Sequence, residues 1–272
     1  MFASCHRLPS ISIVLPVHRL DPHLAQAISS VLKQTHRDFE LLIGVNGKAD
    51  GVTDCVRRLT AGDPRVCIHE LKLGQLAFVL NYLIEKSNGE WIVRMDSDDV
   101  CRPDRIAKLL PLMLEGSVDV VGSWARVIDA NGRVIGRLTP PVDDRSIRRT
   151  MWRGSPLIHP AVAFRRDFWL DIRGYLGGFV TEDTELWMRA AHSRITFANI
   201  PEELLDYRIH GDQAARTLRS YTEVAGHWFR EVLENPNLSS ILGLMLATSK
   251  ALARRLGVRL GRSDRMFRAS SR

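Results

Sequence analysis

The sequence predicts an α/β protein in which helices flank both faces of a mostly parallel sheet. In the first half of the chain, short runs that are almost wholly apolar alternate with segments of helical periodicity. Strands of a parallel sheet are buried on both faces, so they lack the alternation of half-exposed strands, and helices form the crossovers between them. The 272 residues suffice for one large domain of this kind with an appendage.

The first helix has the clearest start signal in the chain. Asp21 can cap it, Pro22 fits a first helical turn, and apolar residues then recur at helical spacing as far as Leu32. By the same criteria we expect strands at 11–17, 39–45, 65–69, 90–95 and 118–121, and helices at 24–32, 52–59, 74–86 and 103–115.

The second half is less regular and predicts a smaller α+β region that closes over the first half. We expect strands at 133–138, 157–164 and 204–209 and a helix at 182–191. Beyond Thr217 the pattern is helical and basic. The expected organisation is therefore a domain at 1–219, divided near residue 122, and an appendage at 220–272.

Composition is that of an ordinary globular protein, with 45% hydrophobic and 25% charged residues. The four cysteines are widely spaced and form no CxxC pattern, which indicates reduced thiols. No apolar run of signal-peptide length follows Met1, and the run at 241–247 is too short to span a bilayer. We therefore expect a cytoplasmic protein.

The net charge of +7 lies entirely in the C-terminal segment, since residues 1–249 sum to zero. This excludes a basic nucleic-acid-binding domain. A basic, partly apolar tail suits an anionic membrane surface or an acidic partner, and a solvated end is the alternative. The basic residues are Lys250, Arg254, Arg255, Arg259, Arg262, Arg265, Arg268 and Arg272, against the single acid Asp264.

The strand at 90–95 ends in three closely spaced carboxylates, Asp96, Asp98 and Asp99. Because such groups repel one another, a fold retains them where a cation neutralises them or where water solvates them. Oxygen ligands of this kind suit Mg²⁺ or Mn²⁺, completed by substrate phosphates. The alternative is an acidic turn before a helix that Pro103 begins.

Several polar residues follow other strands of the predicted sheet. Ligands of parallel α/β sheets bind at the carboxyl ends of strands, so residues 16–18, Asn46 and the three aspartates should converge on one edge. The chain contains neither GxGxxG after its first strand nor GxxxxGK[ST]. A bound nucleotide would therefore be held through a metal.

A second acidic group, Glu182 and Asp183, follows Thr181. One reading is a capped helix whose first-turn acids favour the helix dipole. The other is that one carboxylate is the general base toward an acceptor hydroxyl.

Arg208 and His210 should share one face of the strand at 204–209. Arginine can clamp phosphate, and a neutral imidazole can be a Mn²⁺ ligand, although a lone histidine is as often structural. For His159, before Pro160, we favour a structural role.

Together these segments resemble family 2 glycosyltransferases with the GT-A fold, from about residue 11 to 213. The order and spacing of the pieces carry the resemblance. They are ISIVLPV at 11–17, AISSVLKQT at 27–35, Gly74 with Leu80-Asn81, NGEWIVRMDSDD at 88–99, His159-Pro160, Glu182-Asp183 with Leu186-Trp187, and YRIH at 207–210.

The resemblance implies a Rossmann-like GT-A sheet whose first half, about 1–122, binds a nucleotide-diphosphate sugar, with UDP-sugar as the expected donor. Residues 123–219 would bind a saccharide or lipid-linked saccharide acceptor, and Asp183 would be the base of an inverting transfer. Mn²⁺ or Mg²⁺ would be held by Asp96, Asp98 and His210. The implied donor-binding residues are Pro16, Val17, His18, Asn46, Gly74, Asn81, Asp96, Ser97, Asp98, Asp99, Glu182 and Arg208. Surface polysaccharide or glycolipid synthesis at the inner membrane face would suit the basic tail.

The chain departs from the family pattern at the second strand end, where the usual Asp-Asp-Gly-Ser is Val45-Asn46-Gly47-Lys48. Asn46 therefore offers an amide to the nucleobase. The usual Ala-Arg-Asn is Val79-Leu80-Asn81, which removes a cation, and His18 replaces a common tyrosine. The loss of acids leaves a non-catalytic binding or scaffold subunit as an alternative. A metal-dependent nucleotidyltransferase is another, although it would normally have a glycine-rich basic loop after its first strand.

Overall fold

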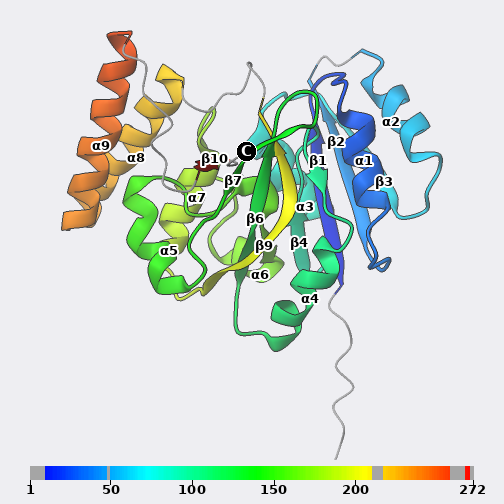
Figure 1. Ribbon diagram of the computed structural model, residues 1–272, viewed down its shortest axis with the longest axis horizontal. Coiled ribbons are helices and arrows are strands. Elements are labelled where there is room, and N and C mark those ends of the chain that lie inside the picture. The colour runs from blue at the N-terminus through cyan, green and yellow to red at the C-terminus, as the bar shows by residue number, and fades with distance from the viewer. Residues whose placement is uncertain (1–9, 48–49, 210–216, 258–266, 270–272) are drawn as a thin grey trace, which may run out of the picture.

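The computed structural model describes residues 10–47, 50–209, 217–257 and 267–269. Over these residues one mixed sheet of ten strands runs through the molecule with helices on both sides (Figure 1). The strand order is β10-β7-β6-β8-β4-β1-β2-β3, and β9 pairs with β5 and β6. The predicted α/β class is confirmed.

The first half of the chain forms the parallel part of the sheet. Hydrogen bonds pair β1 with β2 and β4, and β2 with β3, all parallel. The elements are β1 (Ile11–Val17), α1 (Leu24–Leu32), β2 (Glu40–Asn46), α2 (Val52–Thr60), β3 (Val66–Leu71), α3 (Leu76–Lys86), β4 (Trp91–Arg94) and α4 (Arg105–Glu115). These agree with the expected elements within two residues at most ends. Asp21 lies in the turn before α1, where its carboxylate accepts from the backbone N–H of His23 at 2.8 Å.

The second half adds antiparallel pairs to the sheet. β8 lies antiparallel to β4 and β6, and β7 antiparallel to β6, whereas β9 runs parallel to β6. The elements are β5 (Val100–Cys101), β6 (Val120–Ile128), β7 (Val134–Leu138), α5 (Asp144–Thr150), β8 (Ala163–Arg165), α6 (Arg166–Asp171), α7 (Glu182–Ala191), β9 (Phe197–Arg208), α8 (Leu218–Glu234), α9 (Leu238–Arg255) and β10 (Phe267–Ala269).

Three expectations for these elements need correction. The strand expected at 118–121 is longer, since β6 continues to Ile128. The strand expected at 157–164 is largely wrong, because Pro160 lies in a 3₁₀ turn at His159–Ala161 and only Ala163–Arg165 is a strand. The strand expected at 204–209 begins earlier than expected, because β9 starts at Phe197.

The core has one layer on each face of the sheet. Ile13, Leu15 and Val17 of β1 pack with α1, α2 and α4, whereas Val14 packs with α3, α6 and α7 on the other face. This alternation follows from the two-residue period of a strand. Both layers are apolar, which explains why most positions of β1, β2 and β4 are apolar.

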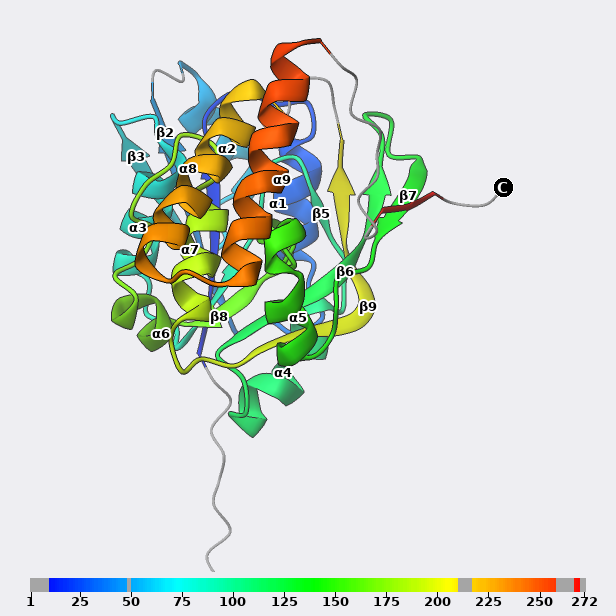
Figure 2. The same ribbon diagram turned by 90° about the vertical axis from the view of Figure 1, so that its left-hand side faces the viewer.

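The α8–α9 hairpin lies at one end of the molecule, on the outer side of α7 (Figure 2). Met188 of α7, Trp228 of α8 and Ala247 of α9 form a small buried cluster there. Helices beyond Thr217 are therefore confirmed, while the domain limits at residues 122 and 219 stay predictions. Within the described residues, no helix is both long enough and apolar enough to cross a membrane.

Candidate active site

The carboxyl ends of three neighbouring strands meet at one edge of the sheet, the upper edge in Figure 1. Val17 of β1 pairs with Val45 of β2, and Val14 of β1 pairs with Arg94 of β4. The register therefore brings residues 16–18, Asn46 and Asp96 to the same edge, as the sequence predicts. Pro16 and Val17 are buried, His18 is exposed and Ser97 is half-buried there.

The acidic turn after β4 has the geometry of a cation site. Asp96, Asp98 and Asp99 each present an oxygen within 4.8 Å of the others. Asp99 is buried, and burial together with the charges of Asp96 and Asp98 raises its pKa well above the usual value. Its Oδ2 is buried and has no hydrogen-bond partner within residues 10–47, 50–209, 217–257 and 267–269. Such a carboxylate is costly without a counter-charge, so the residues present fit a divalent cation. His210, the third expected ligand, lies outside the described residues.

Arg94, the last residue of β4, is the main feature of the site that the sequence analysis missed. Its side chain is 2% exposed, and its Nη1 lies 2.5 Å from Oδ2 of Asp96. Its charge also acts on the second acidic group, because it opposes the rise in pKa of both Glu182 and Asp183. An arginine within an otherwise apolar strand was the available signal, since buried arginines are almost always paired.

Glu182 and Asp183 form the first turn of α7. Burial and then the charge of Asp183 raise the pKa of Glu182 to about 7, and Asp96 acts in the same direction. Burial also raises the pKa of Asp183, while the backbone N–H of Thr184, 2.7 Å from its Oδ1, opposes that rise. The two acidic groups are thus electrostatically coupled across the site.

Thr181 does not cap α7 with its side chain, although it occupies the N-cap position. Its hydroxyl instead donates to the Glu223 carboxylate at 2.9 Å. A cap by Thr181 therefore does not explain the acids that follow it.

Arg208 is buried and its guanidinium contacts protein oxygens. Nε donates to the backbone carbonyl of Asp98 at 2.7 Å, Nη1 to that of Asp129 at 3.0 Å, and Nη2 to Oε1 of Gln26 at 2.9 Å. Its backbone N–H donates to Oδ1 of Asp99 at 2.8 Å. These bonds favour a role in holding the acidic turn, and direct phosphate binding by Arg208 stays a prediction.

Asn81 of α3 also contacts protein rather than open space. Its amide donates to the backbone carbonyl of Tyr175 at 2.8 Å and accepts from the N–H of Tyr175 at 2.9 Å. The Tyr175 hydroxyl lies 2.8 Å from Nε2 of buried His159, which agrees with the structural role expected for that histidine. Donor contact by Asn81 stays a prediction.

Asn46 is the last residue of β2, and Gly74 lies between β3 and α3. Asn46 is 4% exposed, and its Oδ1 is buried with no hydrogen-bond partner among the residues that the structure describes. The next residue, Gly47, has a φ of +76°, which favours glycine at this position. Gly74 is the neighbour of Gly47 across the two loops, and a Cβ there would make an ordinary contact of 3.5 Å with the Gly47 Cα.

Solved structures with this architecture are GT-A glycosyltransferases. TarS residues 1–349 from S. aureus, in complex with UDP-GlcNAc, superposes with a TM-score of 0.70 over 92% of this chain and 76% of that chain, at 16% identity. The mannosyltransferase PcManGT from Pyrobaculum calidifontis, in complex with GDP-Man and Mn²⁺, has a TM-score of 0.66 over 93% of this chain and 77% of that chain, at 15% identity. The fold is therefore of the GT-A type.

Sequence comparison gives the family. Residues 12–172 match the model of glycosyl transferase family 2. The O-antigen biosynthesis glycosyltransferase WbnJ from Escherichia coli is 37% identical over 248 residues, which cover 90% of this chain and 97% of that protein. The chain belongs to glycosyltransferase family 2 and is a glycosyltransferase.

Proposed function

We propose that the protein transfers a sugar, with inversion, from a nucleotide-diphosphate sugar to a hydroxyl of a saccharide or lipid-linked saccharide. The observation that carries this proposal is the arrangement of two acidic groups around buried Arg94. One group, at Asp96 to Asp99, has the chemistry of a cation and diphosphate site. The other, at Glu182 and Asp183, has the raised pKa of a candidate base.

The donor would lie along the edge formed by β1, β2 and β4, with UDP-sugar as the expected donor. The side-chain amide of Asn46, at the end of β2, would hydrogen-bond the nucleobase of the bound donor. We also propose that further residues around this edge contact the donor. They are Pro16, Val17, His18, Gly74, Ser97 and Glu182. The fold shared with a UDP-GlcNAc complex agrees with it.

Asp96, Asp98 and Asp99 would hold Mn²⁺ or Mg²⁺, with His210 as a further ligand. When bound, the ion supplies positive charge for the departing diphosphate. Arg208 would keep the turn in shape through its bonds to Asp98 and Asp99. Among proteins of the same fold, PcManGT was solved with Mn²⁺.

Asp183 would be the general base. As the acceptor oxygen attacks the anomeric carbon from the face opposite the diphosphate, its proton passes to the Asp183 carboxylate. The bond from the anomeric carbon to the diphosphate oxygen breaks, and the nucleoside diphosphate leaves with that electron pair. One displacement inverts the anomeric centre. Arg94 would keep Asp183 ionised against the effect of burial.

We further propose that the protein acts in surface polysaccharide or glycolipid biosynthesis, in the cytoplasm and peripherally at the inner membrane face. The similarity to an O-antigen glycosyltransferase from E. coli supports the pathway. The cations of the C-terminal segment support the location.

A panel of nucleotide sugars with Mn²⁺ tests the activity, with the released nucleotide identified by chromatography. A glycosyltransferase releases a nucleoside diphosphate from the donor. The release is slow when the sugar is transferred to water and faster when it is transferred to a correct acceptor. A nucleotidyltransferase would instead release pyrophosphate from a nucleoside triphosphate and a sugar phosphate. Donor binding without turnover on a broad acceptor panel would favour the scaffold alternative.

A further inference from the structure

The outer face of α9 carries large apolar side chains although the helix lies at the surface. Leu238, just inside its start, and Leu256, just after its end, are 72% and 78% exposed. With the residues between them they recur at helical spacing, so they form one stripe, called here the α9 stripe. Its members are Leu238, Ile241, Met245, Leu252 and Leu256.

The buried face of the same helix is made of small residues. Ser240, Gly243, Ala247 and Ala251 face α8, and Trp228 leaves no room for a Cβ at Gly243. A surface helix normally turns its large apolar residues inward and its small or polar residues outward. α9 does the reverse, and such an exposed apolar face marks an interaction site.

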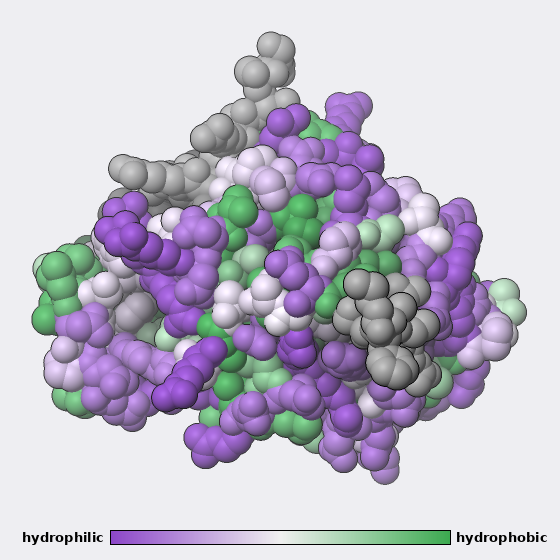
Figure 3. Space-filling model, turned by 90° about the horizontal axis from the view of Figure 1, so that it is seen from below, coloured by the Kyte–Doolittle hydropathy of each residue, from purple (hydrophilic) through white to green (hydrophobic). Residues whose placement is uncertain are grey.

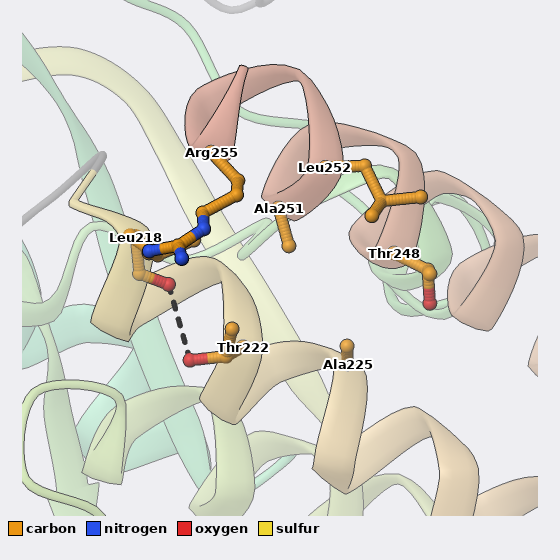
Figure 4. Close-up of a pocket in the computed structure, with 7 residues that line it drawn as sticks. All are labelled: Leu218, Thr222, Ala225, Thr248, Ala251, Leu252 and Arg255. Atoms are coloured by element: carbon orange, nitrogen blue, oxygen red, sulfur yellow. Dashed lines mark hydrogen bonds between the residues drawn. The ribbon is translucent and has the colours of Figure 1, made fainter. Parts of the chain in front are cut away.

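The apolar face continues onto α8. Phe229 and Leu233 of α8 are 55% and 68% exposed. A groove of about 450 Å³ runs between the two helices and is bordered by Leu252 of the α9 stripe (Figure 4). Arg255 extends from α9 over this groove towards Leu218 at the start of α8. Apolar surface is visible at the edge of the molecule where the hairpin lies (Figure 3).

Charge identifies the occupant of this face. α9 contains three cations, Lys250, Arg254 and Arg255, and no acid. The residues that follow in the sequence add five arginines and one acid. Of the three α9 cations, Arg255 lines the groove together with Leu252 of the α9 stripe. An apolar stripe that ends beside a cation matches a bilayer, whose acyl region takes the apolar side chains and whose anionic phosphates pair with the cation.

We propose that the α8–α9 hairpin docks on an anionic bilayer through the α9 stripe, with Arg255 at the lipid phosphates. The docking proposal rests on the proposed function in one respect: docking would bring the candidate active site close to a lipid-linked acceptor. Each cation at the surface strengthens binding about fivefold, so anionic vesicles should bind far more protein than neutral ones.

Vesicle sedimentation of the full chain tests this surface, with phosphatidylglycerol–phosphatidylcholine vesicles against phosphatidylcholine alone. The variant Met245→Glu/Leu252→Glu should bind anionic vesicles at least about tenfold more weakly than wild type. Leu114→Glu/Leu170→Glu, on α4 and α6, makes the same charge change at exposed leucines and should bind like wild type. Nucleotide release with a water-soluble acceptor should be equal in all three proteins.

Three results would overturn the docking surface: no binding of wild type to anionic vesicles, equal binding to neutral ones, or undiminished binding of the stripe variant. A wild-type dimer that the stripe substitutions dissociate in light scattering would assign the face to self-association instead. Because sedimentation is done without substrate, its outcome is independent of whether the protein transfers sugar.

A different set of contacts joins α8 to the candidate base. The Glu223 carboxylate accepts from the backbone N–H groups of Phe179 and Val180, at 3.0 and 3.1 Å, and from the Thr181 hydroxyl. The hydroxyl of Thr181 also lies 3.1 Å from Nε2 of His227. One side chain of the hairpin thus fixes three consecutive residues immediately before Glu182 and Asp183.

We infer that Glu223 is a positioning residue for Asp183, on the proposed assignment of Asp183 as base. In Glu223→Ala the segment before α7 loses three hydrogen bonds, and small displacements of a base are costly. We expect kcat to fall about tenfold or more, with donor KM nearly unchanged and a moderate decrease in melting temperature from the lost hydrogen bonds. Glu223→Gln, which retains one acceptor oxygen, should recover part of kcat.

Glu234→Ala is the matched control, because Glu234 lies on the same helix and its side chain is 63% exposed. Full kcat in Glu223→Ala, or a parallel loss of donor binding and melting temperature, would contradict the positioning role. An active Asp183→Asn variant would refute the base assignment itself and is therefore a separate outcome.

Discussion

Arg94 and Asp96 form an ion pair of 2.5 Å in which the arginine side chain is 2% and the aspartate side chain 30% exposed. The pair stands at the end of β4, where the acidic turn begins. Because an arginine is always charged, its burial is tolerable only beside compensating acids. The pair therefore places a fixed positive charge between the candidate cation site and the candidate base.

The substitution Arg94→Met should affect both the stability of the acidic turn and the pKa of the candidate base Asp183. Loss of the buried cation should lower the free energy of unfolding by about 3 kcal/mol. Since Arg94 opposes the rise in pKa of Asp183, that pKa should rise further and the acidic limb of the kcat profile should move to higher pH. Rate measurements across pH check this, with Arg94→Lys as the charge-retaining control. An unchanged pH profile of kcat in Arg94→Met would show that Arg94 does not affect the pKa of the general base.

Asp183→Asn should reduce kcat by roughly 10²-fold or more, because an amide cannot accept the acceptor's proton. The donor KM should change little, since the proposed role is in the chemical step. Steady-state rates of nucleoside diphosphate release with a responsive acceptor give both constants. Turnover near the wild-type rate would remove Asp183 from the mechanism.

Glu182 should make stability depend on pH. Its folded-state pKa of about 7 exceeds the usual 4.5, so the folded protein binds more protons than the unfolded chain between these values. Unfolding free energy should therefore decrease as pH rises through this window. Glu182→Gln should flatten that slope and raise the melting temperature at pH 8. Thermal melts of the ligand-free proteins from pH 4.5 to 8 provide the comparison, and equal slopes would count against the buried pair.

Asn46→Ala should weaken UDP binding about threefold to tenfold, the effect of one lost hydrogen bond. The ligand-free variant should be about as stable as wild type, because the Asn46 Oδ1 has no hydrogen-bond partner to lose in the described part of the chain. Asn46→Asp, which retains an acceptor oxygen, should keep more affinity than the alanine variant. Calorimetric titration with UDP tests all three proteins. Undiminished UDP affinity in Asn46→Ala would show that the uracil base of UDP does not contact Asn46.

The first half of the fold could be predicted because β1, β2 and β4 are short, mostly apolar runs and because apolar residues recur at helical spacing in the helices. β9 was only partly predictable, since Pro201, Glu202 and Glu203 interrupt its apolar pattern although the strand continues through them. The 3₁₀ turn at His159–Ala161 was not distinguished from a strand, because residues 157–164 are mostly apolar and buried in either conformation.

The candidate site divides in the same way. The acidic turn and Glu182-Asp183 were predictable because clustered carboxylates are conspicuous in sequence. The contacts of Arg94, Arg208 and Glu223 were not, since each depends on side chains brought together from distant segments. Glu223 lies 42 residues beyond Thr181, and no local pattern relates the two.

The proposed mechanism requires that the acidic turn binds a cation that holds the diphosphate. The most direct test is calorimetry of UDP binding, with and without Mn²⁺, on wild type and on Asp98→Ala. We predict that wild type binds UDP at least about tenfold more tightly with Mn²⁺ than with EDTA, and that Asp98→Ala loses this difference. Equal UDP affinity in all four combinations would contradict the account.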